Sequence, residues 1–223
     1  MSIGIRVLRW YGRHKRDLPW RHTDNPYHIW ISEIIFQQTR INQGLEYYKR
    51  FIKRFPDIQT LANSPIDEVL KLWQGLGYYS RARNLHKTAI FLYKNNYSQL
   101  PSEFTELVKL KGIGKYTAAA IASIAFGEPV ALVDGNVYRV LARYYGITAM
   151  VGTSAAEKLF FKKAGEILNK KHPGDHNQAM MELGALVCLP TNPKCSICPI
   201  KADCFAFKNK KQEELPVKAS KKP

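Results

Sequence analysis

Apolar residues recur at helical spacing through most of the chain. In residues 3–14 they stand at Ile3, Val7, Leu8, Trp10 and Tyr11, with basic residues between them, which predicts an amphipathic helix. Residues 25–36 begin with Asn-Pro and are apolar nearly all round, so they predict a buried helix. Similar patterns predict helices over about 43–55, 65–73, 80–94, 134–145, 154–169 and 175–188. We find no alternating strand pattern, and we predict an all-α fold of roughly ten short helices.

Residues 107–120 combine a short apolar helix, a Gly-x-Gly turn and an Ala-rich helix. Gly112 and Gly114 suit a sharp turn whose backbone lies close to another group. The amide groups that begin the second helix form an anion site, and the flanking Lys111 and Lys115 favour a phosphate. A lone Gly-x-Gly also fits an ordinary helical hairpin, so this motif needs support from the rest of the chain.

The chain is strongly basic, with 34 Lys and Arg against 18 Asp and Glu and a formal charge of +16. The excess is not confined to the Lys-rich C-terminal end, so a polyanion is the expected partner, and nucleic acid is favoured over a membrane surface. Twelve Tyr and four Trp can stack on bases. No apolar run approaches the ~18 residues of a membrane helix, and no secretory signal pattern is evident. We therefore expect a cytoplasmic protein without membrane contact.

All four cysteines lie close together, at Cys188, Cys195, Cys198 and Cys204. Without a secretion signal, disulfides are not expected. Four thiolates in such a short stretch can close on one metal centre, which leaves a zinc ion or a [4Fe–4S] cluster as the alternatives. Zinc sites usually show two Cys-x2-Cys pairs and this chain has one, so the spacing modestly favours iron–sulfur.

Two acids and one polar run are candidates for chemistry. Glu33 lies in the apolar helix, where burial would favour the protonated form that a general acid needs, although it could equally face water. Asp134 begins a helix and has an ordinary role as its N-cap. The run Gln37-Gln38-Thr39 ends the apolar helix with side chains that pair well with base edges.

Taken together and in order, these motifs resemble the helix-hairpin-helix DNA glycosylases that carry an iron–sulfur loop, and within that family its adenine-specific branch. The resemblance covers about residues 5–207. Its markers are Leu18-Pro19-Trp20-Arg21, Ser32-Glu33-Ile34-Ile35-Phe36-Gln37-Gln38-Thr39, Gly75-Leu76-Gly77-Tyr78-Tyr79-Ser80-Arg81, Gly112-Ile113-Gly114-Lys115-Tyr116-Thr117-Ala118, Val133-Asp134-Gly135-Asn136-Val137, Asn177-Gln178-Ala179 and the four spaced cysteines.

The resemblance implies a fold and a cofactor. Residues 22–133 are expected to form a six-helix barrel subdomain that includes the hairpin. Residues 1–21 and 134–208 are expected to form an iron–sulfur subdomain with a [4Fe–4S] cluster on the four cysteines, and residues 209–223 a linker or disordered tail. Members of this branch usually continue into a second domain that helps read 8-oxoguanine. This chain is expected to lack that domain, as a natural short form or a truncated one, and so to prefer 8-oxoguanine over guanine less strongly.

The resemblance also implies a function: base excision repair that releases adenine opposite 8-oxoguanine or guanine in double-stranded DNA by base flipping. We expect a bacterial, nucleoid-associated monomer. Endonuclease III-like relatives carry a nucleophilic Lys where this chain has Tyr116, so no Schiff base is expected and the enzyme should be monofunctional. The expected catalytic residues are Glu33 as general acid, Asp134 as stabiliser of the sugar cation, and Tyr116 and Asn136 as orienting groups. The expected binding residues are Trp20, Arg21 and Gln178 for adenine, Gln38 and Thr39 for the opposite base, Tyr78 as the intercalating wedge, and Gly112, Ile113, Gly114 and Lys115 for a DNA phosphate.

Two alternatives stay open. One is a related glycosylase for another mismatched base, such as thymine opposite guanine; the Trp20-Arg21 segment and Gln178 favour adenine. The other is a non-catalytic helix-hairpin-helix DNA-binding module with a structural metal. A pure binding module needs neither Glu33 nor Asp134, which weighs against it.

Overall fold

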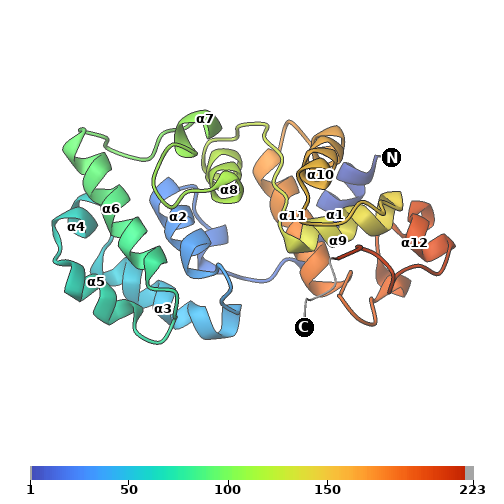
Figure 1. The fold of residues 1–223 in the computed structure, drawn as a ribbon, viewed down its shortest axis with the longest axis horizontal. Helices are drawn as coiled ribbons and strands as arrows, with labels where there is room; N and C mark the ends of the chain where they lie inside the picture. Colours follow the sequence, from blue (N-terminus) through green and yellow to red (C-terminus); the bar gives the residue numbers. More distant parts are fainter. Residues whose placement is uncertain (1, 219–223) are drawn as a thin grey trace. The chain divides into compact units, whose positions relative to one another are not determined.

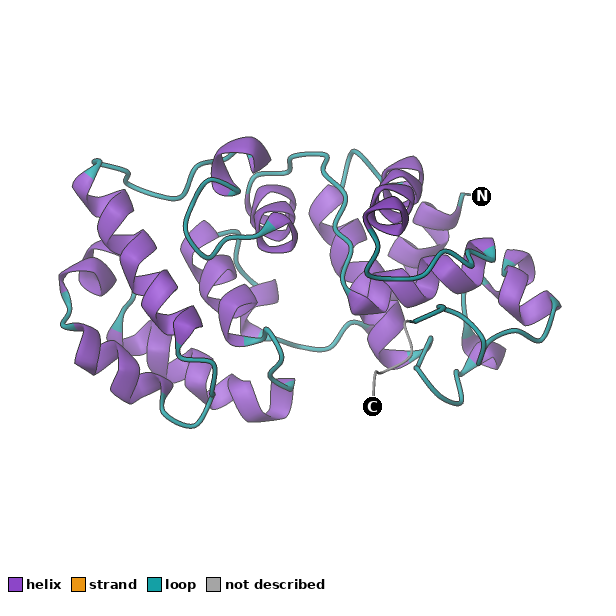
Figure 2. Cartoon of the chain, in the orientation of Figure 1, coloured by secondary structure: helices purple, strands orange, loops and turns teal. Residues whose placement is uncertain are grey.

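The computed structural model describes residues 2–218 of the chain. In this range the structure consists of helices and loops, with a single isolated bridge between Val151 and Lys218 and no β-strand. Figure 2 shows the same helical character throughout the drawn chain. The predicted all-α class is confirmed. No helix within residues 2–218 is both long and apolar enough to cross a membrane.

The chain divides into two compact units, each treated separately below. The hairpin unit is Asp17–Glu128, and the cysteine unit combines Met1–Arg16 with Pro129–Pro223. The sequence placed the divisions at residues 21/22 and 133/134, five residues later in each case than the structure does.

The hairpin unit holds the helices α2 to α8 (Figure 1). Their bounds are α2 Pro26–Ile35, α3 Ile41–Arg54, α4 Ile58–Asn63, α5 Ile66–Trp73, α6 Ser80–Lys94, α7 Phe104–Leu107 and α8 Lys115–Ala125, preceded by the 3-10 turn η1 Pro19–Arg21. Helix α2 packs against α3 and α8, and α6 packs against α4 and α5. The largest fully buried side chains here are those of Trp30, Phe51, Phe55 and Trp73.

Helix α2 forms where the sequence predicts it. The Asn25 side chain accepts hydrogen bonds from the amides of Tyr27 and His28, and Pro26 occupies the first turn, where its missing N–H costs nothing. Seven of the ten residues of α2 are buried. The helix is therefore a central element of the hairpin unit, and its C-terminal end is held in a fixed place.

The cysteine unit holds α1 and the helices from α9 onward. Their bounds are α1 Ile3–His14, α9 Gly135–Tyr145, α10 Ser154–Ile167, α11 Pro173–Leu186, α12 Phe205–Lys208 and the 3-10 turns η2 Cys195–Ile197 and η3 Lys201–Asp203. Helix α11 packs against both α1 and α9, and α12 packs against α9. Because α1 comes from the N-terminus, the two ends of the chain contribute to one core.

The segment expected to be a linker or disordered tail is packed over residues 209–218. The side chain of Leu215 is buried, its carbonyl accepts a hydrogen bond from Arg143 Nε at 2.9 Å, and the Val151 amide donates to the Val217 carbonyl at 3.0 Å. A single apolar residue with backbone partners is enough to dock this Lys-rich stretch. Residues 219–223 of the same prediction lie outside the described residues.

Candidate active site

The predicted Gly-x-Gly hairpin joins α7 to α8. Gly112 has φ +80°, and a Cβ there would come within 2.7 Å of Asn84 Cβ, so both its conformation and its surroundings require glycine. The buried Ile113 anchors the turn, and Thr88 Oγ1 donates to the Lys111 carbonyl at 2.6 Å. Gly114 is the N-cap of α8. The exposed turn thus presents the start of an eleven-residue helix between two exposed lysines, Lys111 and Lys115.

The polar end of α2 is fastened to the same hairpin. Gln37 Nε2 donates to Thr117 Oγ1 at 3.1 Å. Gln38 follows with φ +59°, a left-handed conformation that non-glycine residues rarely adopt, and its side chain is exposed. Thr39 is half-buried and Thr39 Oγ1 lies 3.5 Å from the Gln37 carbonyl. The two residues predicted to face the opposite base therefore lie on a tight turn beside the hairpin helix.

A second strained turn precedes α6. Gly75, Gly77 and Tyr78 have φ of +100°, +69° and +48°, and the Trp73 indole donates to the Gly77 carbonyl at 3.0 Å. The Tyr78 side chain is 64% exposed. A large exposed aromatic ring on this turn is suited to stacking on a base, and the predicted role of Tyr78 as the intercalating wedge stays a prediction.

The remaining predicted site residues of the hairpin unit are all half-buried: Trp20, Arg21, Glu33 and Tyr116. Glu33 is half-buried, between the buried neighbours Ser32 and Ile34 of α2. The half-buried Trp20 ring, in η1, packs on Phe36 with ring centroids 4.4 Å apart. Phe36 is the C-cap residue of α2, so Trp20 lies at the same end of α2 as the polar run.

In the cysteine unit, Asp134 is the N-cap of α9 and also accepts a hydrogen bond from a neighbouring side chain. Its Oδ1 accepts from the Val137 amide at 2.7 Å, and its Oδ2 accepts from Asn136 Nδ2 at 2.8 Å. Burial raises the pKa of Asp134 above its ordinary value of 3.8, and these hydrogen bonds together with the nearby Arg139 act in the opposite direction. Asn136 and Arg139 thus favour the ionised form of a carboxyl that burial would neutralise.

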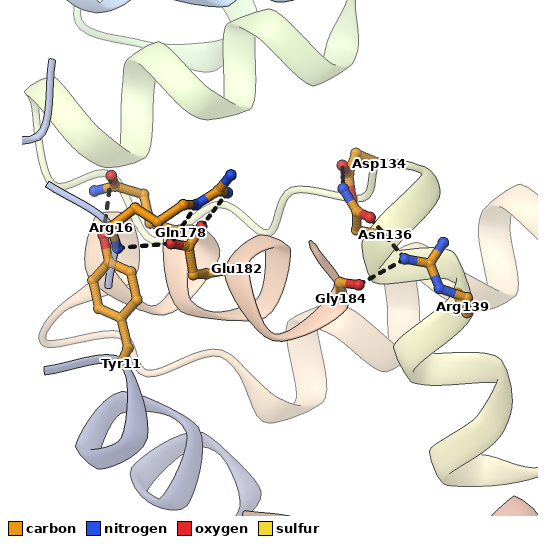
Figure 3. A network of polar contacts seen from close by, with 8 residues as sticks. All are labelled: Tyr11, Arg16, Asp134, Asn136, Arg139, Gln178, Glu182 and Gly184. Atoms are coloured by element: carbon orange, nitrogen blue, oxygen red, sulfur yellow. Dashed lines mark hydrogen bonds and ion pairs between the residues drawn. The ribbon is translucent and has the colours of Figure 1, made fainter. Parts of the chain in front are cut away.

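Arg139 extends this network toward the cysteines, as Figure 3 shows for its first links. Its Nη2 donates to Asn136 Oδ1 and to the Gly184 carbonyl, both at 2.8 Å, and its Nε donates to the Cys188 carbonyl at 2.6 Å. Gly184 is needed because a Cβ there would come within 2.5 Å of Asn136 Cβ. A continuous chain of contacts therefore runs from Asp134 to the backbone of the first cysteine.

Helix α11 carries the predicted Gln178 and also Glu182, which forms an ion pair with Arg16 that the sequence did not predict. Gln178 is buried, and its Oε1 accepts from the Tyr11 hydroxyl at 3.3 Å. One turn later, the buried Glu182 accepts from Arg16 Nε at 2.9 Å and from Arg16 Nη2 at 2.6 Å (Figure 3). A carboxylate four residues after Gln178 lies on the same helix face, and that spacing was the available signal.

The four cysteines border one cavity of the cysteine unit, together with Arg143 and Lys201. Arg143 Nη1 lies 3.4 Å from Cys188 Sγ. Burial raises the pKa of Cys188 and Cys204, and raises that of Cys198 to about 11, and a bound metal would favour the thiolate form of these side chains. Within residues 2–218, no three His, Cys, Asp or Glu side chains lie close enough together to hold one metal ion. The four cysteines match the predicted cluster in donor type and number and share one cavity, but their side chains are not gathered around a common point.

Each unit therefore gathers part of the predicted set. The hairpin unit brings the end of α2, the Tyr78 turn and the hairpin to neighbouring turns, and it also carries Glu33, Trp20, Arg21 and Tyr116. The cysteine unit brings together Asp134, Asn136 and Arg139, and places Gln178 on the helix that ends before Cys188. The roles predicted for these residues stay predictions.

Within residues 2–218 the structure is helical, with a Gly-x-Gly hairpin, a polar network that ends at the Cys188 carbonyl and four cysteines on one cavity. Residues 31–165 match the family described as HhH-GPD superfamily base excision DNA repair protein. The chain belongs to this superfamily.

Curated relatives narrow the comparison. An adenine DNA glycosylase of Buchnera aphidicola (subsp. Baizongia pistaciae, strain Bp) is 46% identical over 217 residues, which cover 97% of this chain and 61% of that protein. The human adenine DNA glycosylase is 41% identical, over 94% of this chain and 40% of its own length. The chain thus spans about three-fifths of the bacterial relative and two-fifths of the human one. The predicted resemblance to MutY-type adenine glycosylases is confirmed.

Solved structures support the same fold. A thermostable thymine-DNA glycosylase superposes with a TM-score of 0.83 at 28% identity, covering 92% of this chain and 95% of that one. Endonuclease III in a non-covalent complex with DNA gives a TM-score of 0.77 at 24% identity, covering 93% and 94%. The predicted helix-hairpin-helix glycosylase fold is confirmed.

Proposed function

We propose that this chain is a DNA glycosylase that hydrolyses the N-glycosidic bond of adenine paired with 8-oxoguanine or guanine in double-stranded DNA. The proposal is carried by Asp134, a half-buried carboxyl whose ionised form is favoured by Asn136, the Val137 amide and Arg139. Such a group is suited to stabilising a developing cation. The adenine DNA glycosylases among the relatives support adenine as the base.

In this proposal Glu33 is the general acid. Its carboxyl protonates adenine N7, the bond between the sugar C1′ and adenine N9 breaks, and the electron pair leaves with the neutral base. The deoxyribose then carries positive charge at C1′, which the Asp134 carboxylate stabilises, as one carboxylate does in retaining glycosidases. Water adds to C1′ and gives its proton to Glu33. Asn136 and Tyr116 orient these acids, and without an amine at Tyr116 the reaction stops at the abasic site.

Some of the proposed binding residues contact the DNA backbone, and others contact its bases. The amides of Gly112 to Lys115 hold a phosphate of the DNA backbone. Tyr78 enters the base stack, and Gln38 and Thr39 contact the base opposite adenine. The flipped adenine is received by Trp20, Arg21 and Gln178, because base flipping is needed to expose the bond to be cleaved. The protein acts as a monomer, and its positive charge keeps it associated with the nucleoid.

A [4Fe–4S] cluster would be held by the four residues Cys188, Cys195, Cys198 and Cys204. Its ligation would cross-link the loop between α11 and α12. This loop carries Lys194 and Lys201, both exposed, and we propose that the ordered loop presents these cations to DNA phosphates. Removal of the iron should then weaken DNA binding; unchanged affinity would contradict this role.

The test is adenine release under single-turnover conditions, followed by alkali to cut abasic sites. The duplexes carry adenine opposite 8-oxoguanine, adenine opposite guanine, thymine opposite guanine, or only normal pairs. Wild-type protein should act on the first two. Glu33→Gln should lower the rate by about 10²- to 10⁴-fold, the usual contribution of a general acid, and Asp134→Asn should lower it strongly.

The outcomes separate the alternatives. Release of thymine but not adenine would replace the proposed substrate with a thymine mismatch. Binding without release of any base would identify a DNA-binding module. Undiminished adenine release by Glu33→Gln would show that another group donates the proton.

A further inference from the structure

The side chain of Arg81, in the first turn of α6, donates to the ends of two separate segments. Its Nη1 donates to the carbonyls of Ile34 at 2.9 Å and Ile35 at 3.1 Å, and also to that of Gln37. Its Nη2 donates to the carbonyls of Leu76 at 3.2 Å and Gly77 at 3.4 Å. One half-buried guanidinium therefore ties the C-terminal end of α2 to the turn before α6.

Two of these five carbonyls belong to the residues directly before the two left-handed non-glycine residues of the turns. Gln38, with φ +59°, directly follows Gln37, and Tyr78, with φ +48°, directly follows Gly77. Each such conformation costs on the order of 1–2 kcal/mol and persists only where the surroundings hold it. Arg81 can stabilise both turns, because it donates hydrogen bonds to the carbonyl of the residue directly before each left-handed position.

The guanidinium also faces the wedge itself. Its Cζ lies 5.6 Å from the centroid of the Tyr78 ring and 5.4 Å from that of Trp73, within the range of cation–π attraction. The exposed Tyr78 ring is therefore held by its own backbone turn and by the same cation that fixes Gln38.

We propose that Arg81 is the positioning residue that sets Gln38 and Tyr78 in register with each other, so that the opposite base is read only when both are in place. This inference rests on the proposed function, in which these two residues contact the opposite base and the stack. Arg81 itself is assigned no contact with DNA. Its effect should therefore fall on the choice between duplexes rather than on binding to DNA in general.

Arginine is required for this role in a way that lysine is not. A rigid planar fork can reach carbonyls of two segments at once, whereas a lysine ammonium offers a single point of donors. Arg81→Lys keeps the charge at the end of α2, which a helix C-terminus favours, and removes the bridge. The substitution separates positioning from simple charge.

The experiment compares wild type, Arg81→Lys and Arg81→Gln with the matched control Arg83→Lys. Arg83 is exposed on the same helix, two residues further on. The readout is the ratio of single-turnover adenine release from duplexes with adenine opposite 8-oxoguanine and opposite guanine, with the affinity for each duplex. We expect Arg81→Lys to lower this ratio by about tenfold, as the loss of charge-assisted hydrogen bonds would. The control should leave the ratio unchanged.

A double substitution adds a readout that a merely structural role would not move. If Arg81 acts through Gln38, the ratio for Arg81→Lys combined with Gln38→Ala should be no lower than for Gln38→Ala alone. Multiplicative effects would overturn the proposal, as would an unchanged ratio in a folded Arg81→Lys protein. Failure of both Arg81 variants to unfold cooperatively would also overturn it, because Arg81 would then serve the fold as a whole.

The failure of the proposed function would look different. Wild-type protein would then release no adenine from either duplex, and Arg81 would be judged on the ratio of the two duplex affinities alone. A ratio lowered by Arg81→Lys would still support positioning, and an unchanged one would overturn it.

Discussion

Each unit contains an arginine that donates hydrogen bonds to several backbone carbonyls, but the two arginines differ in how deeply they are buried. In the cysteine unit, Arg143 is 3% exposed and donates to the carbonyls of Leu189, Pro190 and Leu215 at 2.6 to 2.9 Å. In the hairpin unit, Arg81 is half-buried and its acceptors lie beside exposed residues of two turns. The first arginine is enclosed by what it binds, and the second holds residues that face solvent.

This difference in burial indicates which substitutions should lower stability and which should affect DNA binding. The Arg143 side chain is buried, so removing it leaves several acceptors without their donor, which is costly. The polar residues around Tyr78 and Gln38 are at the surface, so their loss should affect what the protein binds more than whether it folds. The predictions below test this contrast, from the largest effect on stability to the smallest.

Arg143→Ala should lower the stability of the fold more than any other substitution considered below. The carbonyls of Leu189, Pro190 and Leu215 and the Cys188 Sγ atom lose a donor that is itself buried, and the expected decrease in the free energy of unfolding is on the order of 3 kcal/mol. Chemical denaturation of the holoprotein measures it. The exposed Arg13 provides the matched control, since Arg13→Ala should change stability by less than about 0.5 kcal/mol. Equal losses would remove the contrast between interior and surface arginines.

Asn136→Ala should change the pH dependence of catalysis more than stability. Burial raises the pKa of Asp134, and the Asn136 hydrogen bond lowers it. If the reaction needs ionised Asp134, the rate is lost as pH falls through this pKa. Without the Asn136 donor the ionised form is less favoured, so the pKa rises and the acidic limb of the rate profile moves to higher pH. Single-turnover rates across pH measure this shift.

The raised pKa of Asp134 also affects stability, because the folded state binds a proton at this carboxyl more readily than the unfolded state does. It therefore contributes stability that is present below pH 3.8 and lost as pH rises through the folded value. Asp134→Asn should abolish that part of the pH dependence. A limb that moves to lower pH in Asn136→Ala would contradict the role given to Asn136.

A pair of glycines compares the units at almost the same backbone angle. Gly146 has φ +71° and Gly127 has φ +69°, but a Cβ at Gly146 would come within 2.6 Å of the Phe205 ring, whereas nothing lies within 4 Å of one at Gly127. Gly127→Ala should cost about 1 kcal/mol for the left-handed conformation. Gly146→Ala should cost about 1–3 kcal/mol more because the ring must move. Equal costs, measured by thermal unfolding, would show that Phe205 moves freely.

The helices and the hairpin were predictable because their signals are local. The sequence placed helices at residues 3–14 and 80–94, and α1 and α6 have those bounds. Asp134 was predicted to begin a helix over about 134–145, and it is the N-cap of α9, which ends at Tyr145. These features depend on side chains within a few positions of each other, which the sequence displays directly.

The interior network was not predictable, because its partners are distant in sequence. Arg16 and Glu182 are 166 residues apart and nothing local marks them as a pair. Arg143 bonds to backbone carbonyls, which every residue has, so no residue type could identify its acceptors. Leu215 lies in a Lys- and Pro-rich stretch, and its burial and its bond to Arg143, 72 residues away, are not marked by any local pattern.

Tyr78→Ala should have the smallest effect on stability and a clear effect on function. The side chain is 64% exposed, so its loss should change the free energy of unfolding by less than about 0.5 kcal/mol. Alanine keeps the β-carbon, which is the atom that disfavours a left-handed backbone such as φ +48°. No gain in stability is therefore expected from relief of backbone strain. Binding to a mismatched duplex should weaken about tenfold, the loss of one stacked base. Tyr93→Ala is the matched control, because Tyr93 is 41% exposed on the distal part of α6. A similar loss of binding in both variants would show that exposed tyrosines contribute generally, and that the turn which Arg81 fixes gives Tyr78 no special role.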